Sequence, residues 1–292
     1  MKSSVVWILA SRPRTLVAAV VPVAVGTALA AHEGAAAFSP ALFCLLFALL
    51  IQVGTNFAND YFDFMKGADR GDRRGPLRVT ATGLVSPWTM QRAFIAVFIA
   101  AFAAGLPLVA FGGWWLLPLG MVCVLAGLAY TAGPFPLAYN GLGDVFVFAF
   151  FGIVAVTFTY YVQAGSFSAA SFLAAVAVGA LSTNILLVNN YRDRDTDIDA
   201  GKNTLVVLLG ERFSLVQYAV LYVLAFLAPV ALFFSGFSFP VLIPLVLAPL
   251  AARLVYRLPR AVTGPEYNAL LEGTAKLMIL YGALFSVGIV LG

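Results

Sequence analysis

The chain has 292 residues, of which 62% are hydrophobic and only 10% are charged. A water-soluble domain of this length needs more charge to cover its surface, so the composition excludes an ordinary soluble protein. The net charge of +4 indicates no nucleic-acid partner, because the basic residues gather on one side of a predicted membrane.

The chain contains nine apolar segments that are long enough to cross a membrane. An α-helix needs roughly 17 to 25 residues to span about 30 Å of hydrocarbon. The sequence therefore predicts an all-α polytopic membrane protein with nine transmembrane helices, at residues 15–31, 38–54, 93–111, 114–130, 145–162, 172–188, 214–234, 239–255 and 270–291.

The basic residues predict the orientation of these helices. All 17 Lys and Arg fall on one side, in or beside the segments 2–14, 66–92, 192–212 and 253–276. The other side carries only His32 and Glu33. By the positive-inside rule, the amino terminus and the long loops lie in the cytoplasm and the carboxyl terminus lies outside. The expected location is the cytoplasmic (inner) membrane of the cell.

The first apolar segment has an alternative reading as a signal peptide. Basic residues precede it, and "ALAAHEGAAA" offers small residues for cleavage. The charge rule does not distinguish the two readings, because cleavage leaves the second helix in the same orientation. Cys44 and Cys123 lie within apolar helices and indicate neither a disulfide nor a metal site.

Two polar clusters follow apolar segments on the predicted cytoplasmic side. In "NFANDYFDF" the spacing is N-x3-D-x2-D, and in "NNYRDRDTDID" it is N-x3-D-x3-D. Each cluster is followed by Lys and Gly, in "MKGAD" and "AGKNT". This weak repeat predicts a single domain over 1–292 with two related halves, whose acidic motifs at 56–69 and 189–203 come together.

The spacing of the clusters favours a cation site. In a helix, Asn56, Asp60 and Asp63 lie on one face, and the same holds for residues 189, 193 and 197. Asp195 and Asp199 fall on the opposite face and are weaker candidates. Like charges repel at this spacing, and oxygen ligands without His or Cys favour Mg²⁺. A single acidic cluster is often only solvated by water. Two clusters of similar spacing on the same side of the membrane favour a shared site.

Mg²⁺ usually takes one or two carboxylates together with phosphate oxygens of a substrate. Two facing clusters thus predict two Mg²⁺ ions that hold a diphosphate, in a substrate whose lipid tail lies among the apolar helices. Isoprenyl diphosphates fit this description. Nearby cations that could reach the diphosphate are Lys66, Arg70, Arg78, Arg192 and Lys202. Arg73 and Arg74 are better explained by topology or by lipid headgroups.

"NDYFDFMKGAD" and "RDRDTD" with "GKNTL" resemble the two aspartate-rich motifs of the UbiA superfamily of intramembrane prenyltransferases. The resemblance extends over nearly the whole chain through "SRPRTL", "GPLR", "YTAGPFPLAYNGLGD" and "YNALLEGTAK". These motifs are most similar to the branch that prenylates 1,4-dihydroxy-2-naphthoate in menaquinone synthesis. The resemblance also argues against the signal peptide, because the family keeps its first helix.

The resemblance implies a helical bundle around a central cavity with a polar cytoplasmic cap. It also implies roles for the motif residues. The catalytic and metal-binding candidates are Asp60, Asp63, Asp193 and Asp197, with Asp69 as a further metal ligand. The diphosphate-binding candidates are Asn56, Asn59, Lys66, Arg78, Arg192 and Lys202. Asp144 departs from the expected pattern, in which Glu is frequent at this position.

The resemblance further implies the reaction. Polyprenyl diphosphate ionises, the ring of the acceptor attacks the allyl cation, and the ring carboxyl leaves as CO2 to give demethylmenaquinone. Candidates for binding the acceptor are Tyr130, Tyr139, Asn140 and Asp144, although packing explains each tyrosine equally well. The nearest alternative is a sister enzyme that uses 4-hydroxybenzoate or homogentisate. A cation transporter is the alternative from another class, and the signature of CDP-alcohol phosphotransferases is missing.

Overall fold

The computed structural model describes residues 3–68 and 77–292. Within them the chain is helical, as predicted, and its only β-type pairing is a single bridge between Asn140 and Asn203. Seven helical segments are long and apolar enough to cross a membrane, and the bent pair α1 and α2 would make an eighth. The predicted span at 114–130 forms a helix of only 14 residues, so the count of nine is approximate.

The helices are numbered in chain order. The α-helices are α1 (Ser3–Ser11), α2 (Val17–His32), α3 (Phe38–Met65), α4 (Pro87–Gly105), α5 (Val109–Gly112), α6 (Leu116–Ala129), α7 (Gly143–Val147), α8 (Ala155–Ala164), α9 (Ala169–Arg192), α10 (Arg194–Asp199), α11 (Leu205–Phe234), α12 (Ala248–Arg257) and α13 (Gly264–Leu291). The 3₁₀ turns are η1 (Pro13–Thr15), η2 (Leu106–Leu108), η3 (Leu137–Tyr139), η5 (Phe239–Leu247) and η6 (Leu258–Arg260), and η4 (Phe148–Val154) is a π-helix.

Several helices are longer or more broken than the hydrophobic pattern predicts. α3 continues to Met65, eleven residues past the apolar run that ends at 54, because its polar end is buried by other helices. A further helix, α1, precedes the first predicted span, and this added segment is bent by 53° relative to α2. Gly210, with φ 82°, divides α11 near its start. The hydrophobic pattern therefore locates the spans but not their polar extensions.

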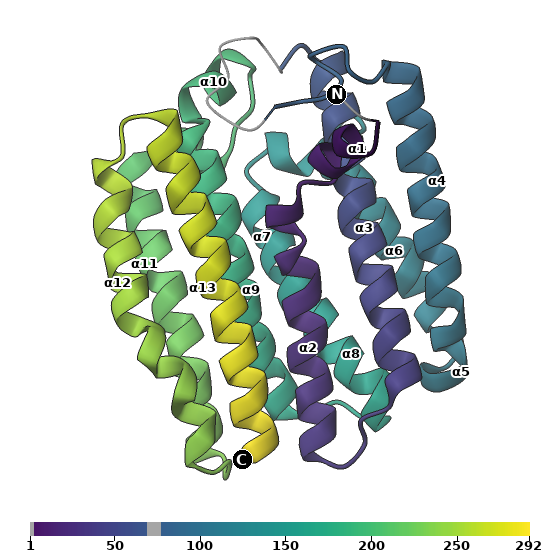
Figure 1. Cartoon of the computed structure of the whole chain (residues 1–292), viewed down its shortest axis with the longest axis vertical. Helices are drawn as coiled ribbons and strands as arrows, with labels where there is room; N and C mark the ends of the chain where they lie inside the picture. Colours follow the sequence, from purple (N-terminus) through teal and green to yellow (C-terminus); the bar gives the residue numbers. More distant parts are fainter. Residues whose placement is uncertain (1–2, 69–76) are drawn as a thin grey trace.

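The helices form one bundle with its polar motifs at one end (Figure 1). α10 and the carboxyl-terminal end of α3 lie at the end of the bundle that carries the amino terminus. The carboxyl terminus lies at the opposite end. This arrangement brings the two acidic motifs to the same end of the bundle, as the charge pattern predicts.

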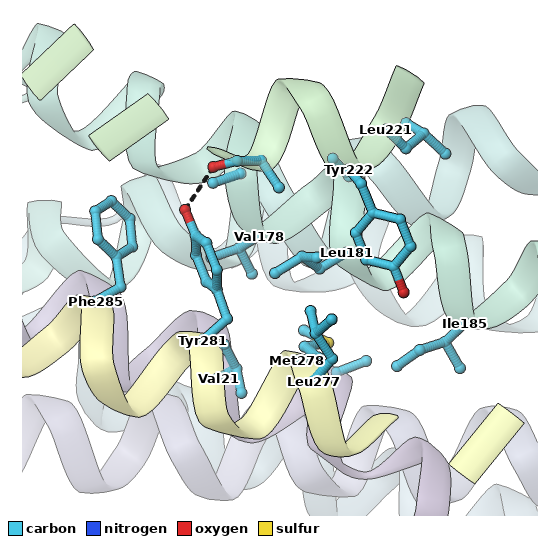
Figure 2. Close-up of a cluster of buried hydrophobic side chains, with 14 of the residues drawn as sticks. Val21, Val178, Leu181, Ile185, Leu221, Tyr222, Leu277, Met278, Tyr281 and Phe285 are labelled. Atoms are coloured by element: carbon cyan, nitrogen blue, oxygen red, sulfur yellow. Dashed lines mark hydrogen bonds between the residues drawn. The ribbon is translucent and has the colours of Figure 1, made fainter. Parts of the chain in front are cut away.

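The largest core cluster joins helices that are distant in the sequence, among them α2, α9, α11 and α13. Val21 of α2, Leu181 of α9, Tyr222 of α11 and Phe285 of α13 are among its buried residues (Figure 2). The hydroxyl of Tyr281 donates a hydrogen bond of 2.6 Å to the carbonyl of Ala225, so the buried polar group has a partner. This cluster shares several residues with the wall of the cavity described next.

Candidate active site

A cavity of about 630 Å³ lies within the bundle. Much of its wall is apolar and comes from several helices: Phe47, Leu106, Leu116, Phe146, Phe150 and Phe158. Its polar residues include Arg12, Asn56, Asn59, Asp63, Arg78, Tyr130, Asn189 and Lys202. Phe47 precedes Asn56 by nine residues on α3, which is about 13 Å along the helix axis. The cavity thus combines a charged region with a long apolar wall.

The first acidic motif lies on the buried side of α3. The Asp60 carboxylate is only 2% exposed and accepts hydrogen bonds from the backbone N–H groups of Val79 and Thr80, at 3.2 and 3.4 Å. The Asp63 carboxylate accepts from Nη2 of Arg78 at 3.0 Å. Of the two aspartates, only Asp63 lies on the cavity wall.

The second acidic motif is not one continuous helix, so the helix expected through residues 189–197 is wrong at Asp193. α9 ends at Arg192, Asp193 forms a turn, and α10 follows. Hydrogen bonds from the Asp193 N–H to the Asn189 carbonyl (3.1 Å) and from the Asp197 N–H to the Asp193 carbonyl (2.8 Å) preserve the helical spacing. Asp193 and Asp197 are accordingly buried, whereas the alternating Asp195 is exposed.

Arg192 is buried in the protein, and it is not part of the cavity wall. Its guanidinium donates to both carboxylate oxygens of Asp193 at 2.7 Å, and also to Asn189 and Asn268 at 2.7 and 2.9 Å. This arrangement fixes the position of Asp193 in the ligand-free protein. It gives Arg192 a local structural role that the sequence did not indicate.

Tyr139 connects the two motifs. Its hydroxyl donates to Asp63 at 2.8 Å, and its ring lies 5.9 Å from the ammonium of Lys202. Lys202 in turn lies 3.4 Å from the Asp197 carboxylate. The backbone N–H of Asn203 donates to the Tyr139 carbonyl at 3.1 Å. The loop that carries Tyr139 therefore brings together two motifs that are more than 100 residues apart in the sequence.

Lys66 approaches Tyr139 from the first motif. Its ammonium lies 4.2 Å from the centre of the Tyr139 ring and donates to the Thr131 carbonyl at 2.6 Å. Burial lowers the pKa of Lys66, and the carboxylate of Asp63 opposes this shift. Lys66 thus contributes positive charge next to Asp63, although it does not line the cavity.

Only one of the four acceptor-binding candidates lies on the cavity wall. Tyr130 lines the cavity, and the charges of Asp63, Asp144 and Asp197 all act on its hydroxyl. The buried carboxylate of Asp144 accepts from Nε2 of Gln217 at 3.0 Å. Asn140 donates to the nearby carbonyl of Pro136, which is a contact within its own loop.

Of the predicted site residues within 3–68 and 77–292, seven line the cavity: Asn56, Asn59, Asp63, Arg78, Tyr130, Asn189 and Lys202. The others lie around it: Asp60, Lys66, Arg192, Asp193, Asp197, Tyr139, Asn140 and Asp144. Asp69, predicted as a metal ligand, and Arg70, Arg73 and Arg74 lie outside the described residues.

Sequence reasoning missed several polar residues beside the site. Arg12 lines the cavity, and Thr15 and Gln52 lie next to Asn56. Thr131 donates a hydrogen bond to Asn59, and Gln217 contacts Asp144. The charged "SRPRTL" segment before an apolar helix could have pointed to Arg12 as a site residue. The positive-inside rule, however, explains its basic residues equally well.

The donor atoms of the motifs suit a hard divalent cation. They are carboxylate and amide oxygens, and the four motif aspartates are 2–8% exposed. Residues 3–68 and 77–292 contain no group of three or more His, Cys, Asp or Glu side chains that could hold a metal ion. Mg²⁺ fits such a set, because it commonly uses one or two carboxylates and completes its shell with water and phosphate oxygens.

Comparison with known proteins identifies the family. Residues 19–269 match the UbiA prenyltransferase family. The chain is a member of that family. It is 39% identical to the 1,4-dihydroxy-2-naphthoate octaprenyltransferase of Escherichia coli (strain K12), over 98% of this chain and 95% of that protein. It is 30% identical to the Bacillus subtilis (strain 168) protein of the same name, over 98% and 92%.

The fold of this UbiA prenyltransferase agrees with solved structures. A UbiA homologue from Archaeoglobus fulgidus, bound to GPP and Mg²⁺, superposes with a TM-score of 0.67 at 16% identity. The superposition covers 96% of this chain and 99% of that one. The protein is therefore a multi-pass membrane enzyme that transfers prenyl groups.

Proposed function

We propose that this UbiA prenyltransferase transfers a polyprenyl chain from polyprenyl diphosphate to 1,4-dihydroxy-2-naphthoate, with release of diphosphate and CO2. The observation that carries this proposal is the near full-length similarity to relatives named as 1,4-dihydroxy-2-naphthoate octaprenyltransferases. The product is demethylmenaquinone in its reduced form, because neither prenyl transfer nor decarboxylation oxidises the ring.

The charges around the cavity support a diphosphate site. Arg12, Arg78 and Lys202 line the cavity together with Asp63. A guanidinium pairs well with two phosphate oxygens, and a lysine ammonium adds a compact charge. The apolar wall formed by Phe47, Phe150 and other residues suits a prenyl tail.

We propose Mg²⁺ as the metal, with Asp60, Asp63, Asp193 and Asp197 as its protein ligands. When bound, Mg²⁺ supplies positive charge to the diphosphate oxygens. The A. fulgidus homologue was solved with GPP and Mg²⁺, which supports this assignment. Two ions fit two motifs, although each motif aspartate has other partners in the ligand-free protein.

The residues of the chain then account for the main steps. Arg78 and Lys202 stabilise the diphosphate as the allylic C–O bond breaks and its electron pair leaves with the oxygen. The apolar wall keeps water away from the allyl cation, and the nearby phenylalanine rings stabilise its charge. The ring carbon that carries the carboxylate provides the electron pair for the new C–C bond. The bond from this carbon to the carboxylate then breaks, its electron pair restores the aromatic ring, and CO2 leaves.

Tyr130 is the candidate that best fits an acceptor contact. It lines the cavity, and carboxylates of both motifs act on it. We propose that its hydroxyl donates a hydrogen bond to the acceptor. Tyr139 and Asp144 do not line the cavity. They support this part of the site through hydrogen bonds with Asp63 and Gln217, respectively.

An acceptor panel tests the proposal. Purified protein in lipid vesicles receives labelled prenyl diphosphate, Mg²⁺ and one of three acceptors, and the products are identified by mass spectrometry. We expect a prenylated product from dihydroxynaphthoate and none from 4-hydroxybenzoate or homogentisate. A product from hydroxybenzoate alone would reassign the protein to the sister branch.

A further inference from the structure

The connection between α1 and α2 contains an unusual backbone conformation at Arg12. Its φ is 51° and its ψ is 71°, and no other non-glycine residue in the described part of the chain has a positive φ. This left-handed conformation is unfavourable for an arginine unless the surroundings enforce it. Strained residues of this kind concentrate at functional sites, and Arg12 lies on the wall of the cavity.

Two amide side chains of α3 bind this connection. Oγ1 of Thr15 accepts hydrogen bonds from Nε2 of Gln52 at 3.2 Å and from Nδ2 of Asn56 at 3.1 Å. The same hydroxyl donates to the carbonyl of Arg12 at 2.9 Å. Thr15 therefore connects the backbone of Arg12 to α3.

Asn56 also holds the residue before Arg12. Its Nδ2 donates to the carbonyl of Ser11 at 2.9 Å, in addition to its bond with Thr15. The amides of α3 thus fix the chain on both sides of the strained residue. Helix packing alone does not require side-chain hydrogen bonds to the backbone carbonyls of Ser11 and Arg12, which lie on the two sides of the left-handed Cα.

The position of Arg12 suits a role in the charged region. Arg12 shares the cavity with Asp63, Arg78 and Lys202, and its charge acts on the carboxylate of Asp60. It comes from the amino-terminal segment, whereas Arg78 follows the first motif. The guanidinium of Arg12 can therefore reach the diphosphate from a different side of the site.

We infer that Thr15, Gln52 and Asn56 are positioning residues, which hold Arg12 in the left-handed conformation and so direct its guanidinium to the diphosphate. The inference rests on the proposed function. It also changes the interpretation of Asn56, because the amide predicted to bind the diphosphate instead acts through Arg12. Gln52 and Thr15 gain a role that the acidic motifs do not indicate.

A matched pair of substitutions tests the inference. Thr15→Val removes the hydroxyl at the connection. Thr27→Val is the control, because the Thr27 hydroxyl also accepts an amide hydrogen bond, from Gln163 at 3.1 Å, but lies outside the cavity wall. We expect Thr15→Val to raise the KM for prenyl diphosphate roughly tenfold, as three hydrogen bonds are lost, with an unchanged KM for the acceptor. Thr15→Ser should restore it, and Thr27→Val should leave both KM values unchanged.

A double-mutant cycle separates positioning from a general loss of packing. In an Arg12→Lys background, where the guanidinium is absent, Thr15→Val should have little further effect on that KM. Equal effects of Thr15→Val in both backgrounds, or equal effects of Thr15→Val and Thr27→Val, would overturn the inference.

Binding of inorganic diphosphate with Mg²⁺, measured by calorimetry, gives a readout that does not need turnover. Thr15→Val should weaken this binding roughly tenfold, and Thr27→Val should not change it. Unchanged binding in Thr15→Val would overturn the inference even if catalysis is slow. Failure of the wild-type protein to prenylate any acceptor would instead refute the proposed function.

Discussion

At the residue scale, three of the four motif aspartates are already paired with cations in the ligand-free protein, while Asp60 accepts backbone hydrogen bonds. Asp63 pairs with Arg78 at 3.0 Å, Asp193 with Arg192 at 2.7 Å, and Asp197 with Lys202 at 3.4 Å. Pairing reduces the cost of burying these charges. Arg78 and Lys202 lie on the cavity wall and can exchange a carboxylate for a phosphate, whereas Arg192 stays with Asp193.

The second motif allows a test with two aspartates that are two residues apart. Asp197 is buried beside Lys202, and Asp195 is exposed. We expect Asp197→Asn to lower kcat by roughly a hundredfold or more, because a proposed charged ligand of the metal is lost. Asp195→Asn should retain near-normal kcat. Steady-state kinetics of both variants, at equal protein levels in the membrane, check this, and equal activity of the two would contradict the assigned site.

Two substitutions of Tyr139 separate the contribution of its hydroxyl from the contribution of its ring. Tyr139→Phe removes the hydrogen bond to Asp63 but keeps the ring beside Lys66 and Lys202. We expect a decrease in kcat/KM of roughly tenfold, typical of one hydrogen bond to a charged group. Tyr139→Leu should cost roughly tenfold more, since the cation–π contacts are lost as well. If both variants keep wild-type kcat/KM, Tyr139 does not connect the motifs functionally.

The motif residues could be predicted from sequence, but their partners could not. Helical spacing placed Asp60 and Asp63 on one face, and it separated Asp197 from Asp195. Spacing is a local property, so it contains no information about Tyr139 or Arg12, which reach the site through tertiary packing. The assignment of Asn56 and Arg192 to the diphosphate stays a prediction. In the ligand-free protein their side chains bind the Ser11 carbonyl and the Asp193 carboxylate.

At the element scale, α9 and the π-helix η4 approach each other through glycines. A Cβ atom on Gly152 would lie 2.5 Å from Cα of Gly179 and 2.6 Å from the carbonyl oxygen of Ala175. Both neighbours are backbone atoms, which move only if a helix moves. The adjacent residues Phe150 and Phe151 line the cavity, so this contact also sets the position of the apolar wall.

Gly152→Ala should therefore destabilise the protein. We expect a loss of about 1–3 kcal/mol, typical of overpacking, measured as a lower thermal midpoint in detergent. Gly120→Ala is the matched control, because its Cβ would meet Phe102 only at 3.8 Å, an ordinary contact. Equal thermal midpoints for the two variants would contradict the close packing of α9 and η4.

Hydrophobic length predicted most helices well, because burial in lipid requires long apolar segments. It could not predict the break at Arg12 or the short α6, since both depend on packing within the bundle. The proposed relation between the two halves rests on the spacing of the motifs and stays a prediction.

At the scale of the whole molecule, the termini lie at opposite ends of the bundle (Figure 1). This arrangement requires an odd number of crossings. If the bent pair of α1 and α2 is counted as an eighth span, the 14-residue α6 is needed as the ninth. We propose that the amino terminus faces the cytoplasm, because the basic residues gather at that end. Reporter fusions should show the amino terminus inside and the carboxyl terminus outside, and two termini on the same side would contradict it.

The central claim is that prenyl transfer and decarboxylation occur together on dihydroxynaphthoate. The most direct test supplies the acceptor with a labelled carboxyl group and follows labelled CO2 and prenylated product in one reaction. We predict that they form in a one-to-one ratio, and only when prenyl diphosphate is present. A prenylated product that retains the labelled carboxyl group, or CO2 release without prenyl diphosphate, would contradict the account.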